Sequence, residues 1–210
     1  MKTKLFVALL IGLGTVACSG GEHDEPENNQ EQEQEEVCSY SYDQANTKFE
    51  WTAYKTSDKV GVKGSFQDIE VESEANEDAK KVIESLHFKM TTAKVSSGNE
   101  DRDMKISKHF FETINTPTIS GQVKSVNDDG TAVISVTMNG VTKDVQGTYE
   151  MHANDFAFTA SIDVSDWNAI PGIEALNKIC KDLHTGADGV SKLWSEVGLS
   201  FSTSLISDCD

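Results

Sequence analysis

Side chains able to carry out acid–base, nucleophilic or metal chemistry are scattered along this chain of 210 residues. No two histidines have metal-ligand spacing, and there is no Gly-x-Ser-x-Gly elbow, phosphate-binding loop or His-Glu-x-x-His motif. Asp166 and Asp182 are isolated carboxylates that suit surface or helix-cap positions. We therefore expect a protein that is not an enzyme, without catalytic residues, metal or cofactor. A hydrolase or isomerase using Asp103, His109 or Asp163 is the less favoured alternative.

The first of four cysteines suggests a different chemistry, lipidation. The segment 15–18, Thr-Val-Ala-Cys, follows two lysines and a short apolar run, as in a bacterial lipoprotein signal peptide. We predict a signal peptide over residues 1–17 and a lipid-modified Cys18 that anchors the protein to a membrane, with an ordinary signal peptide as the alternative. Because Ser19 is not Asp, we expect the outer membrane of a Gram-negative-type cell envelope, with the protein facing the periplasm or exposed at the surface.

The other three cysteines, Cys38, Cys180 and Cys209, are expected in an oxidising compartment, where disulfides persist. Three is an odd number, so one thiol stays free or pairs between chains. A bridge from Cys209 would tie down the end of the chain. Its partner is either Cys38, which a closing barrel would bring close, or Cys180 across a shorter loop. We favour Cys180 slightly.

An acidic segment precedes the domain. Residues 22–36 contain eight acidic residues and no Lys or Arg, in a chain of net charge −17. Too few apolar groups are present to offset the entropy of ordering, so residues 18–38 are predicted to be an acidic disordered tether. Residues 39–210 are then one folded domain. Without a basic stripe, a nucleic-acid partner is excluded. The sequence leaves the oligomeric state open.

The elements of this domain are mostly strands. Asn139-Gly140 lies between two alternating runs and is typical of a β-hairpin turn. Eight segments alternate apolar and polar residues, as strands with one buried face do: 49–53, 60–66, 86–90, 119–123, 132–138, 141–145, 156–162 and 197–205. We predict an all-β fold, an eight-stranded antiparallel up-and-down barrel closed without free edges. Helical spacing at 101–114 and 172–183 predicts two short helical inserts over the barrel, with a shorter turn at 77–84.

The inward strand faces carry almost no ionisable groups. A cavity lined in this way binds apolar surface, at about 25 cal/mol per Å² removed from water, and disfavours sugars, nucleotides and peptides. Small residues on these faces would leave a lengthwise slot suited to a long thin chain: Ala53, Gly64, Gly121, Ala132 and Ala160. The alternative is a solid barrel core.

Four segments occur in order along the chain: Asn-Thr-Lys-Phe-Glu-Trp at 46–51, the segment 101–119, Met-Asn-Gly-Val-Thr at 138–142 and the segment 158–167. With this order and spacing, the chain resembles the YceI-like family of lipocalin-like polyisoprenoid-binding proteins over roughly residues 39–207. The resemblance implies a lipocalin-like barrel around a polyprenyl chain, such as that of an isoprenoid quinone or lipid carrier. Arg102 and Asp103 match the family's Arg-Asp pair, and His109 stands where the family more often has Asp. They are candidates for a gate that meets the lipid head group, or for an ion pair and helix cap, which we favour slightly.

The expected function is therefore to bind and to sequester or carry a polyisoprenoid-type long-chain lipid, with no separate cofactor. A structural or interaction barrel without ligand is the alternative. The residues predicted to line the ligand are Phe49, Trp51, Val62, Phe66, Phe88, Met90, Phe110, Phe111, Val136, Met138, Phe156, Phe158 and Phe201.

Overall fold

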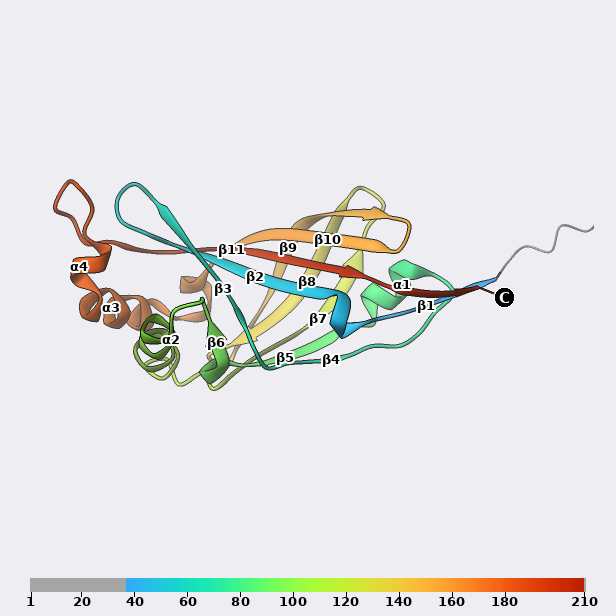
Figure 1. The fold of residues 1–210 in the computed structure, drawn as a ribbon, viewed down its shortest axis with the longest axis horizontal. Helices are drawn as coiled ribbons and strands as arrows, with labels where there is room; N and C mark the ends of the chain where they lie inside the picture. Colours follow the sequence, from blue (N-terminus) through green and yellow to red (C-terminus); the bar gives the residue numbers. More distant parts are fainter. Residues whose placement is uncertain (1–36, 210) are drawn as a thin grey trace, which may run out of the picture. The chain divides into compact units, whose positions relative to one another are not determined.

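The computed structural model describes residues 37–209, in which antiparallel strands form one curled sheet (Figure 1). Ten strands follow the order β4-β5-β7-β8-β9-β10-β11-β2-β3-β6. In chain order they are β2 Thr47–Lys55, β3 Val60–Phe66, β4 Ile69–Glu72, β5 His87–Thr91, β6 Val95–Ser96, β7 Thr118–Val126, β8 Thr131–Met138, β9 Val141–His152, β10 Asp155–Asp163 and β11 Leu193–Ser204. A separate two-stranded ribbon pairs β1 Cys38–Ser41 with β12 Ile206–Cys209.

The predicted Asn-Gly hairpin is confirmed. Asn139 and Gly140 have φ angles of 50° and 69°, and Met138 pairs with Val141 across the turn. Positive φ at both central residues matches the twist of the flanking strands, which is why Asn and Gly occupy this turn. The alternating pattern likewise predicted β2, β3, β5, β7, β8, β9, β10 and β11, so all eight expected strands are present.

The prediction of a closed eight-stranded barrel is wrong, because the sheet has ten strands and is a half-barrel. Strand β3 pairs with β2 only from Trp51↔Gly64 to Lys55↔Val60, and then turns away so that Ser65 and Phe66 pair with β6. Within residues 37–209, β4 pairs only with β5, and the first four residues of β2 have no strand partner on the β3 side. We call the opening between residues 47–50 and residues 69–72 the β2–β4 gap.

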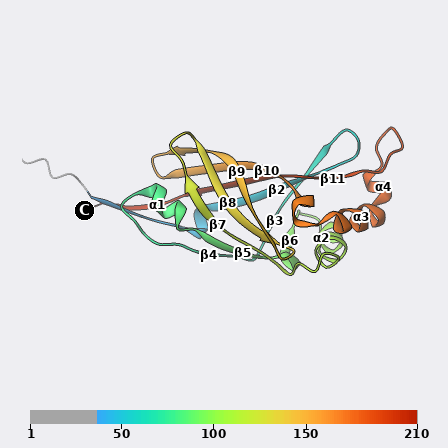
Figure 2. The ribbon, with the colours of Figure 1, turned by 180° about the vertical axis from the view of Figure 1, so that it is seen from behind.

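The helices gather mainly at one end of the sheet (Figures 1 and 2). There, α2 Glu100–Ile106 continues into the π-helical segment η3 Ser107–Phe111, close to α3 Ile170–Ile179 and α4 Lys181–His184. The inserts predicted at 101–114 and 172–183 are thus confirmed. Helix α1 Ala79–Glu84 lies toward the other end, where the β1–β12 ribbon extends. Short 3-10 turns complete the fold: η1 Gln44–Asn46, η2 Thr92–Lys94 and η4 Val164–Trp167.

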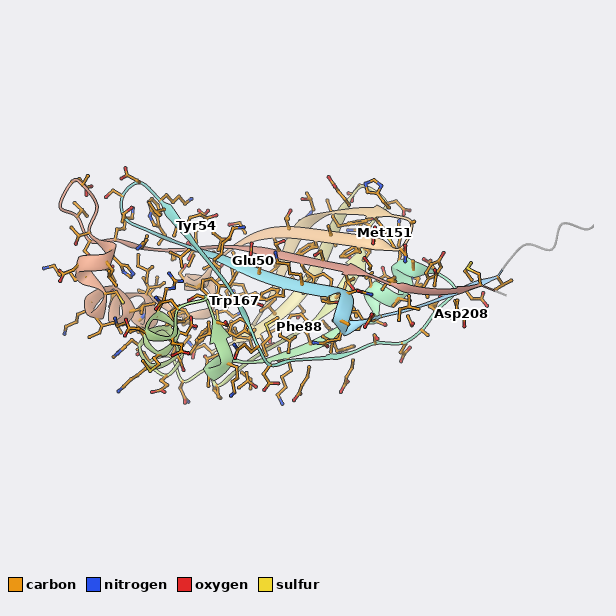
Figure 3. All side chains as sticks on the ribbon, in the orientation of Figure 1. Glu50, Tyr54, Phe88, Met151, Trp167 and Asp208 are labelled. Carbon is orange, nitrogen blue, oxygen red and sulfur yellow. A yellow bond between two sulfur atoms is a disulfide. The ribbon has the colours of Figure 1, made fainter. Side chains whose placement is uncertain are left out.

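Two clusters of buried apolar side chains hold these elements together. The first includes Phe110, Phe111, Trp167 and Leu176 and seats the helices against the sheet. The second packs α1 against the strands near the other end. Its members are Val82, Ile83, Leu86, Val126, Ala132, Phe156, Phe158 and Leu205. Figure 3 shows Trp167 of the first cluster toward the helical end, with Asp208 of the ribbon at the opposite end.

A disulfide joins Cys38 to Cys209, so the preference for Cys180–Cys209 was wrong. The two cysteines are paired residues of β1 and β12, and this antiparallel pairing brings them together over a sequence separation of 171. Cys180 is a buried free thiol beside α3, and burial raises its pKa. The predicted signal peptide, Cys18 and most of the predicted tether lie outside the described residues. Cys38, predicted to end the tether, begins β1.

Candidate functional site

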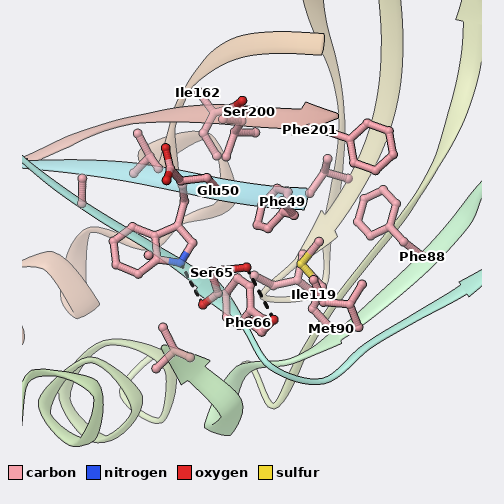
Figure 4. Close-up of a pocket in the computed structure, with 18 of the residues that line it drawn as sticks. Phe49, Glu50, Ser65, Phe66, Phe88, Met90, Ile119, Ile162, Ser200 and Phe201 are labelled. Atoms are coloured by element: carbon pink, nitrogen blue, oxygen red, sulfur yellow. Dashed lines mark hydrogen bonds between the residues drawn. The ribbon is translucent and has the colours of Figure 1, made fainter. Parts of the chain in front are cut away.

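An apolar cavity of about 610 Å³ lies within the curl of the sheet. This volume is in the range of sites for small-molecule ligands, about 300–1,000 Å³. Phe88, Ile119, Val197 and Leu199 border the cavity and remain only half-buried. These apolar side chains keep accessible surface because they face a hollow that the protein does not fill. Figure 4 shows the rings of Phe49, Phe88 and Phe201 converging on this space.

Aromatic rings form a continuous row along one wall of the cavity. The ring centroids of Phe49 and Phe66 are 6.2 Å apart, those of Phe66 and Phe111 5.9 Å, and those of Phe111 and Phe110 4.9 Å. These separations are typical of offset and edge-to-face aromatic contacts. The row leads from β2 to η3, so the strand wall and the helical end are one apolar surface.

Eleven of the thirteen predicted lining residues border the cavity. The two exceptions are Val62 and Phe156. Val62 is half-exposed on β3, and Phe156 is buried in the second cluster, where its ring centroid lies 5.3 Å from that of Tyr149. That the eleven contact a ligand stays a prediction. They are Phe49, Trp51, Phe66, Phe88, Met90, Phe110, Phe111, Val136, Met138, Phe158 and Phe201.

Several lining residues were missed because they lie on short or helical elements. Ile69 and Val71 belong to the four-residue strand β4, which is too short to show an alternating pattern. Ile173 and Leu176 come from α3. Their helical spacing was visible in the sequence, but it does not tell which neighbour the apolar face meets.

The expected slot above the small residues is absent at two positions, because aromatic rings fill the space. A Cβ on Gly64 would lie 2.3 Å from Cζ2 of Trp51, and one on Gly121 would lie 2.4 Å from Cζ of Phe88. Each ring therefore packs against the glycine that pairs with its strand position. Because these glycines have no Cβ, there is room for the rings, and the cavity lies among the aromatic side chains.

Arg102 and Asp103 converge on Ser97 and do not line the cavity. The Ser97 amide donates to Oδ1 of Asp103 at 2.8 Å, and the Ser97 hydroxyl also donates to that carboxylate. Arg102 donates from Nε to the Ser97 hydroxyl and from a terminal nitrogen to the Ser97 carbonyl, each at 2.7 Å. Ser97 itself borders the cavity. The pair thus fixes one lining residue through charge-assisted hydrogen bonds.

The expected ion pair and cap need correction as well. Within residues 37–209, Arg102 and Asp103 form no salt bridge with each other, and the cap of α2 is Asn99, whose side chain accepts from the Arg102 amide at 2.9 Å. His109 lies in η3 and is not on the cavity lining. A gating role of these three residues is therefore untested, and their direct contact with a ligand in the cavity is not supported by this geometry.

Polar lining residues gather at the β2–β4 gap. Gln44, Lys48, Lys63 and Gln67 are exposed there. Nζ of Lys63 lies 2.6 Å from Oε1 of Glu50, and Nζ of Lys48 lies 3.8 Å from Oε2. The hydrogen bond from Lys63 lowers the pKa of Glu50, so this carboxylate is ionised at neutral pH. Two ammonium groups therefore share one carboxylate at the mouth of the cavity.

The walls of the cavity are chiefly aliphatic and aromatic side chains, which suit an apolar ligand. In residues 37–209, no three His, Cys, Asp or Glu side chains are arranged to hold a metal ion. The same part of the chain contains no helix of the length and apolarity that crossing a bilayer requires. A half-barrel of antiparallel strands curled around an apolar hollow is a lipocalin-like architecture.

Within that class, residues 40–205 match the YceI-like domain, so this chain belongs to the YceI-like family. This confirms the resemblance in the sequence. No protein of the curated set matches the chain.

Two of the solved structures that share the fold illustrate the similarity. A polyisoprenoid binding domain from Saccharophagus degradans, implicated in plant cell wall breakdown, is similar with a TM-score of 0.53 and 14% identity, covering 84% of this chain and 100% of that one. BcnA of Burkholderia cenocepacia is similar with a TM-score of 0.53 and 16% identity, covering 80% and 99%.

Proposed function

We propose that the domain binds a long-chain isoprenoid-type lipid in its cavity and sequesters or carries it at the cell envelope. The observation that carries the proposal is the hollow itself, whose inward walls are aliphatic and aromatic side chains. Such walls favour an apolar chain in proportion to the area removed from water. A sugar or nucleotide would lose hydrogen bonds to water without replacement.

The shape of the site also favours a chain over a compact molecule. The lining runs from Leu86 and Val71, near α1, to Leu176 and Trp194, near the helical end. An extended hydrocarbon would contact both ends at once. The Saccharophagus degradans domain is described as polyisoprenoid binding, which agrees with a ligand of this kind.

The place of action is part of the proposal. A lipid on Cys18 would hold the protein at the membrane, since two or more acyl chains make attachment durable. The acidic residues 22–36 would let the domain move near that surface. Replacing Cys18→Ala should release the protein into the soluble fraction, whereas continued membrane association would reject the anchor.

The ligand is tested by extraction of the native protein. Protein purified from its own cells without detergent exchange is extracted with organic solvent, and the extract is analysed by mass spectrometry. We expect one long-chain isoprenoid lipid in stoichiometric amount, and addition of a polyprenol to delipidated protein should raise its Tm. An extract that contains no lipid, together with a Tm that polyprenol does not change, would favour a domain that binds partners through its outer surface.

A further inference from the structure

Exposed apolar side chains gather at the helical end of the domain. Ile179 of α3, Leu183 of α4 and Met104 of α2 are 51%, 60% and 65% exposed. A contiguous apolar surface of this kind marks a site of contact with a protein or a membrane. The other large exposed apolar side chains of residues 37–209 lie either on neighbouring segments of this end or at the β1–β12 ribbon: Val60, Ile170 and Val190 at the end, and Val37 and Ile206 at the ribbon.

Ile179 and Leu183 share one face of a nearly continuous helix. The Cys180 amide donates to the Leu176 carbonyl and the His184 amide to the Cys180 carbonyl, each at 3.0 Å, so helical spacing persists from α3 into α4. These three residues recur every four positions and are buried. Ile179 and Leu183 recur at the same spacing and are exposed. Because residues four apart lie on the same side of a helix, they form an apolar stripe that no part of residues 37–209 covers.

Hydrogen bonds join this stripe to the turn between β2 and β3. Nζ of Lys55 donates to the Leu183 carbonyl at 3.1 Å, and the Thr56 amide donates to the Lys192 carbonyl at 2.8 Å. Nε1 of Trp194 donates to the Thr56 carbonyl at 2.8 Å. Figures 1 and 2 show the turn and α4 at the same end of the sheet. We call residues 55–60, 178–183 and 190–194 the helical-end surface.

Lysines without acidic partners surround the apolar stripe. Residues 170–192 contain three lysines and three carboxylate residues, so this segment is neutral, whereas the whole chain has a net charge of −17. An anionic surface therefore repels the rest of the domain more strongly and is approached by the helical end first. The lysines of the helical-end surface that form no salt bridge within residues 37–209 are Lys55, Lys178, Lys181 and Lys192.

A tryptophan and a lysine lie together on this surface. Nζ of Lys192 is 3.2 Å from the centroid of the Trp194 ring, and Trp194 is partly exposed. Tryptophan is enriched at membrane interfaces, and a lysine there can cover apolar surface with its stem while its ammonium group reaches the head groups. Protein–protein interfaces, by contrast, are depleted in lysine. The composition therefore favours a bilayer over a protein partner.

We propose that the helical-end surface docks the domain on an anionic lipid bilayer, with the apolar stripe at the boundary of head groups and acyl chains and the unpaired lysines at lipid phosphates. This end lies opposite the ribbon through which the chain enters the domain (Figure 1). Docking is therefore a contact separate from any attachment before residue 37. Ile173 and Leu176 of α3 border the cavity, so docking places the hollow one helix away from the membrane.

The first experiment measures binding of the Cys18→Ala protein to vesicles by flotation, so that no acyl anchor on Cys18 contributes. We expect binding to phosphatidylcholine vesicles that contain phosphatidylglycerol, weakening as salt rises, and little binding to phosphatidylcholine alone. Lys178→Gln/Lys181→Gln should weaken binding about ten-fold, since each lysine is attracted by the anionic surface. Ile179→Ser/Leu183→Ser should weaken it by at least about ten-fold, because less apolar area enters the bilayer.

Two control variants make the same chemical changes elsewhere. Lys124→Gln/Lys143→Gln removes two exposed lysines of β7 and β9, and Ile206→Ser removes an exposed apolar side chain of the ribbon. Both controls should bind as the parent does, and all variants should keep its Tm, because the changed side chains are exposed. Binding that falls equally in the controls, or that neither helical-end variant reduces, would overturn the docking surface.

The second experiment reports the position of the surface in protein attached by its own anchor to vesicles of the same anionic composition. The vesicles contain lipids brominated close to the head group, which quench tryptophan on contact. Trp194 is partly exposed, whereas Trp51 and Trp167 are buried. We expect partial quenching that disappears in Trp194→Phe. No quenching, or quenching that persists fully in Trp194→Phe, would overturn the contact.

These outcomes are independent of the extraction test. Docking by a protein whose extract contains no lipid would keep this inference and overturn the proposed function. A lipid-loaded protein that fails both vesicle experiments would keep the proposed function and overturn docking.

Discussion

The indole of Trp51 packs against Gly64, its pairing partner on β3, and donates a hydrogen bond from Nε1 to the Ser65 carbonyl at 3.3 Å. A Cβ at Gly64 would also lie 2.8 Å from the backbone oxygen of Ser96 in β6. This one residue therefore lets β3 approach both Trp51 and β6. It stands where β3 leaves β2 and the β2–β4 gap begins.

Replacing Gly64→Ala should lower the free energy of unfolding by roughly 1–3 kcal/mol, because the added methyl overpacks this contact. Tryptophan fluorescence of the variant should shift, since Trp51 must move. Gly61→Ala on the same strand is the control. Its Cβ would meet only side-chain atoms at 3.2 Å and beyond. Equal losses in the two variants would contradict the proposed packing.

Filling the hollow should abolish lipid binding without unfolding the domain. Ala53 borders the cavity, and the ring introduced by Ala53→Phe would occupy space that the ligand needs. We expect at least a ten-fold loss of polyprenol affinity with Tm kept within a few degrees, measured by a lipid-binding titration and thermal unfolding. Thr159→Phe, on an exposed strand position, is the control and should bind normally. Retained affinity in Ala53→Phe would place the ligand elsewhere.

Asp103 should prove a positioning residue. Asp103→Ala removes the acceptor of two hydrogen bonds from Ser97, so unfolding free energy should fall by about 1–3 kcal/mol. Polyprenol affinity of the folded variant should change little, because Asp103 does not border the cavity. Asp101→Ala, whose exposed carboxylate pairs with Lys105, serves as the control. A large loss of affinity with unchanged stability would instead support a gate that touches the ligand.

The Cys38–Cys209 bridge should contribute to stability. Replacing both by Ser should lower the free energy of unfolding by about 2–5 kcal/mol, since the bridge closes a long loop in the unfolded chain. Non-reducing peptide mapping should recover the linked peptides, with the Cys180 peptide unlinked. Recovery of Cys180 joined to Cys209 would contradict the assignment.

Stability should depend on pH through His184. Burial, and secondarily Lys55, lowers the pKa of this imidazole below its ordinary value of 6.5, while Nδ1 lies 2.9 Å from Oδ1 of Asn177. The folded state therefore binds fewer protons than the unfolded state just below pH 6.5. This contribution is complete above that pH and is lost as pH falls toward the folded pKa, by at most about 1.4 kcal/mol per pH unit.

The measurement is urea unfolding from pH 7.5 down to pH 5. His184→Gln should flatten the loss of stability over this range. His152→Gln, at the exposed last residue of β9, is the control and should behave as the parent protein does. Identical slopes in all three proteins would show that His184 does not titrate differently on folding.

The sequence predicted what depends on local pattern. The alternation in β10 predicted that Phe158 lies on the inward face, and the Asn139-Gly140 turn predicted the pairing of β8 with β9. Phe156 shares the strand face of Phe158 but lies at the end of the half-barrel that the second cluster fills. Alternation predicts the face on which a residue lies and not its position along the half-barrel. That position depends on which distant element, here α1, packs against that face.

Whether the strands close into a complete barrel could not be predicted, for a related reason. It depends on where β3 stops pairing with β2, and this is set by Ser65 and Phe66 pairing with a two-residue strand some 30 positions away. A strand of two residues has no period to detect. Arg102 and Asp103 are joined to Ser97 by local hydrogen bonds over five and six residues, but their residue types alone were equally compatible with a gate, an ion pair or a cap.

The ribbon at the start of the domain has a mechanical consequence. Any load arriving through residue 37 meets a two-stranded ribbon that, without a cross-link, would unzip one hydrogen bond after another. The disulfide between Cys38 and Cys209 instead distributes the force over both ribbon strands, β1 and β12, which lead to β2 and β11. Strands β2 and β11 are paired with each other over most of their length. A force applied at residue 37 is thereby converted into shear between β2 and β11.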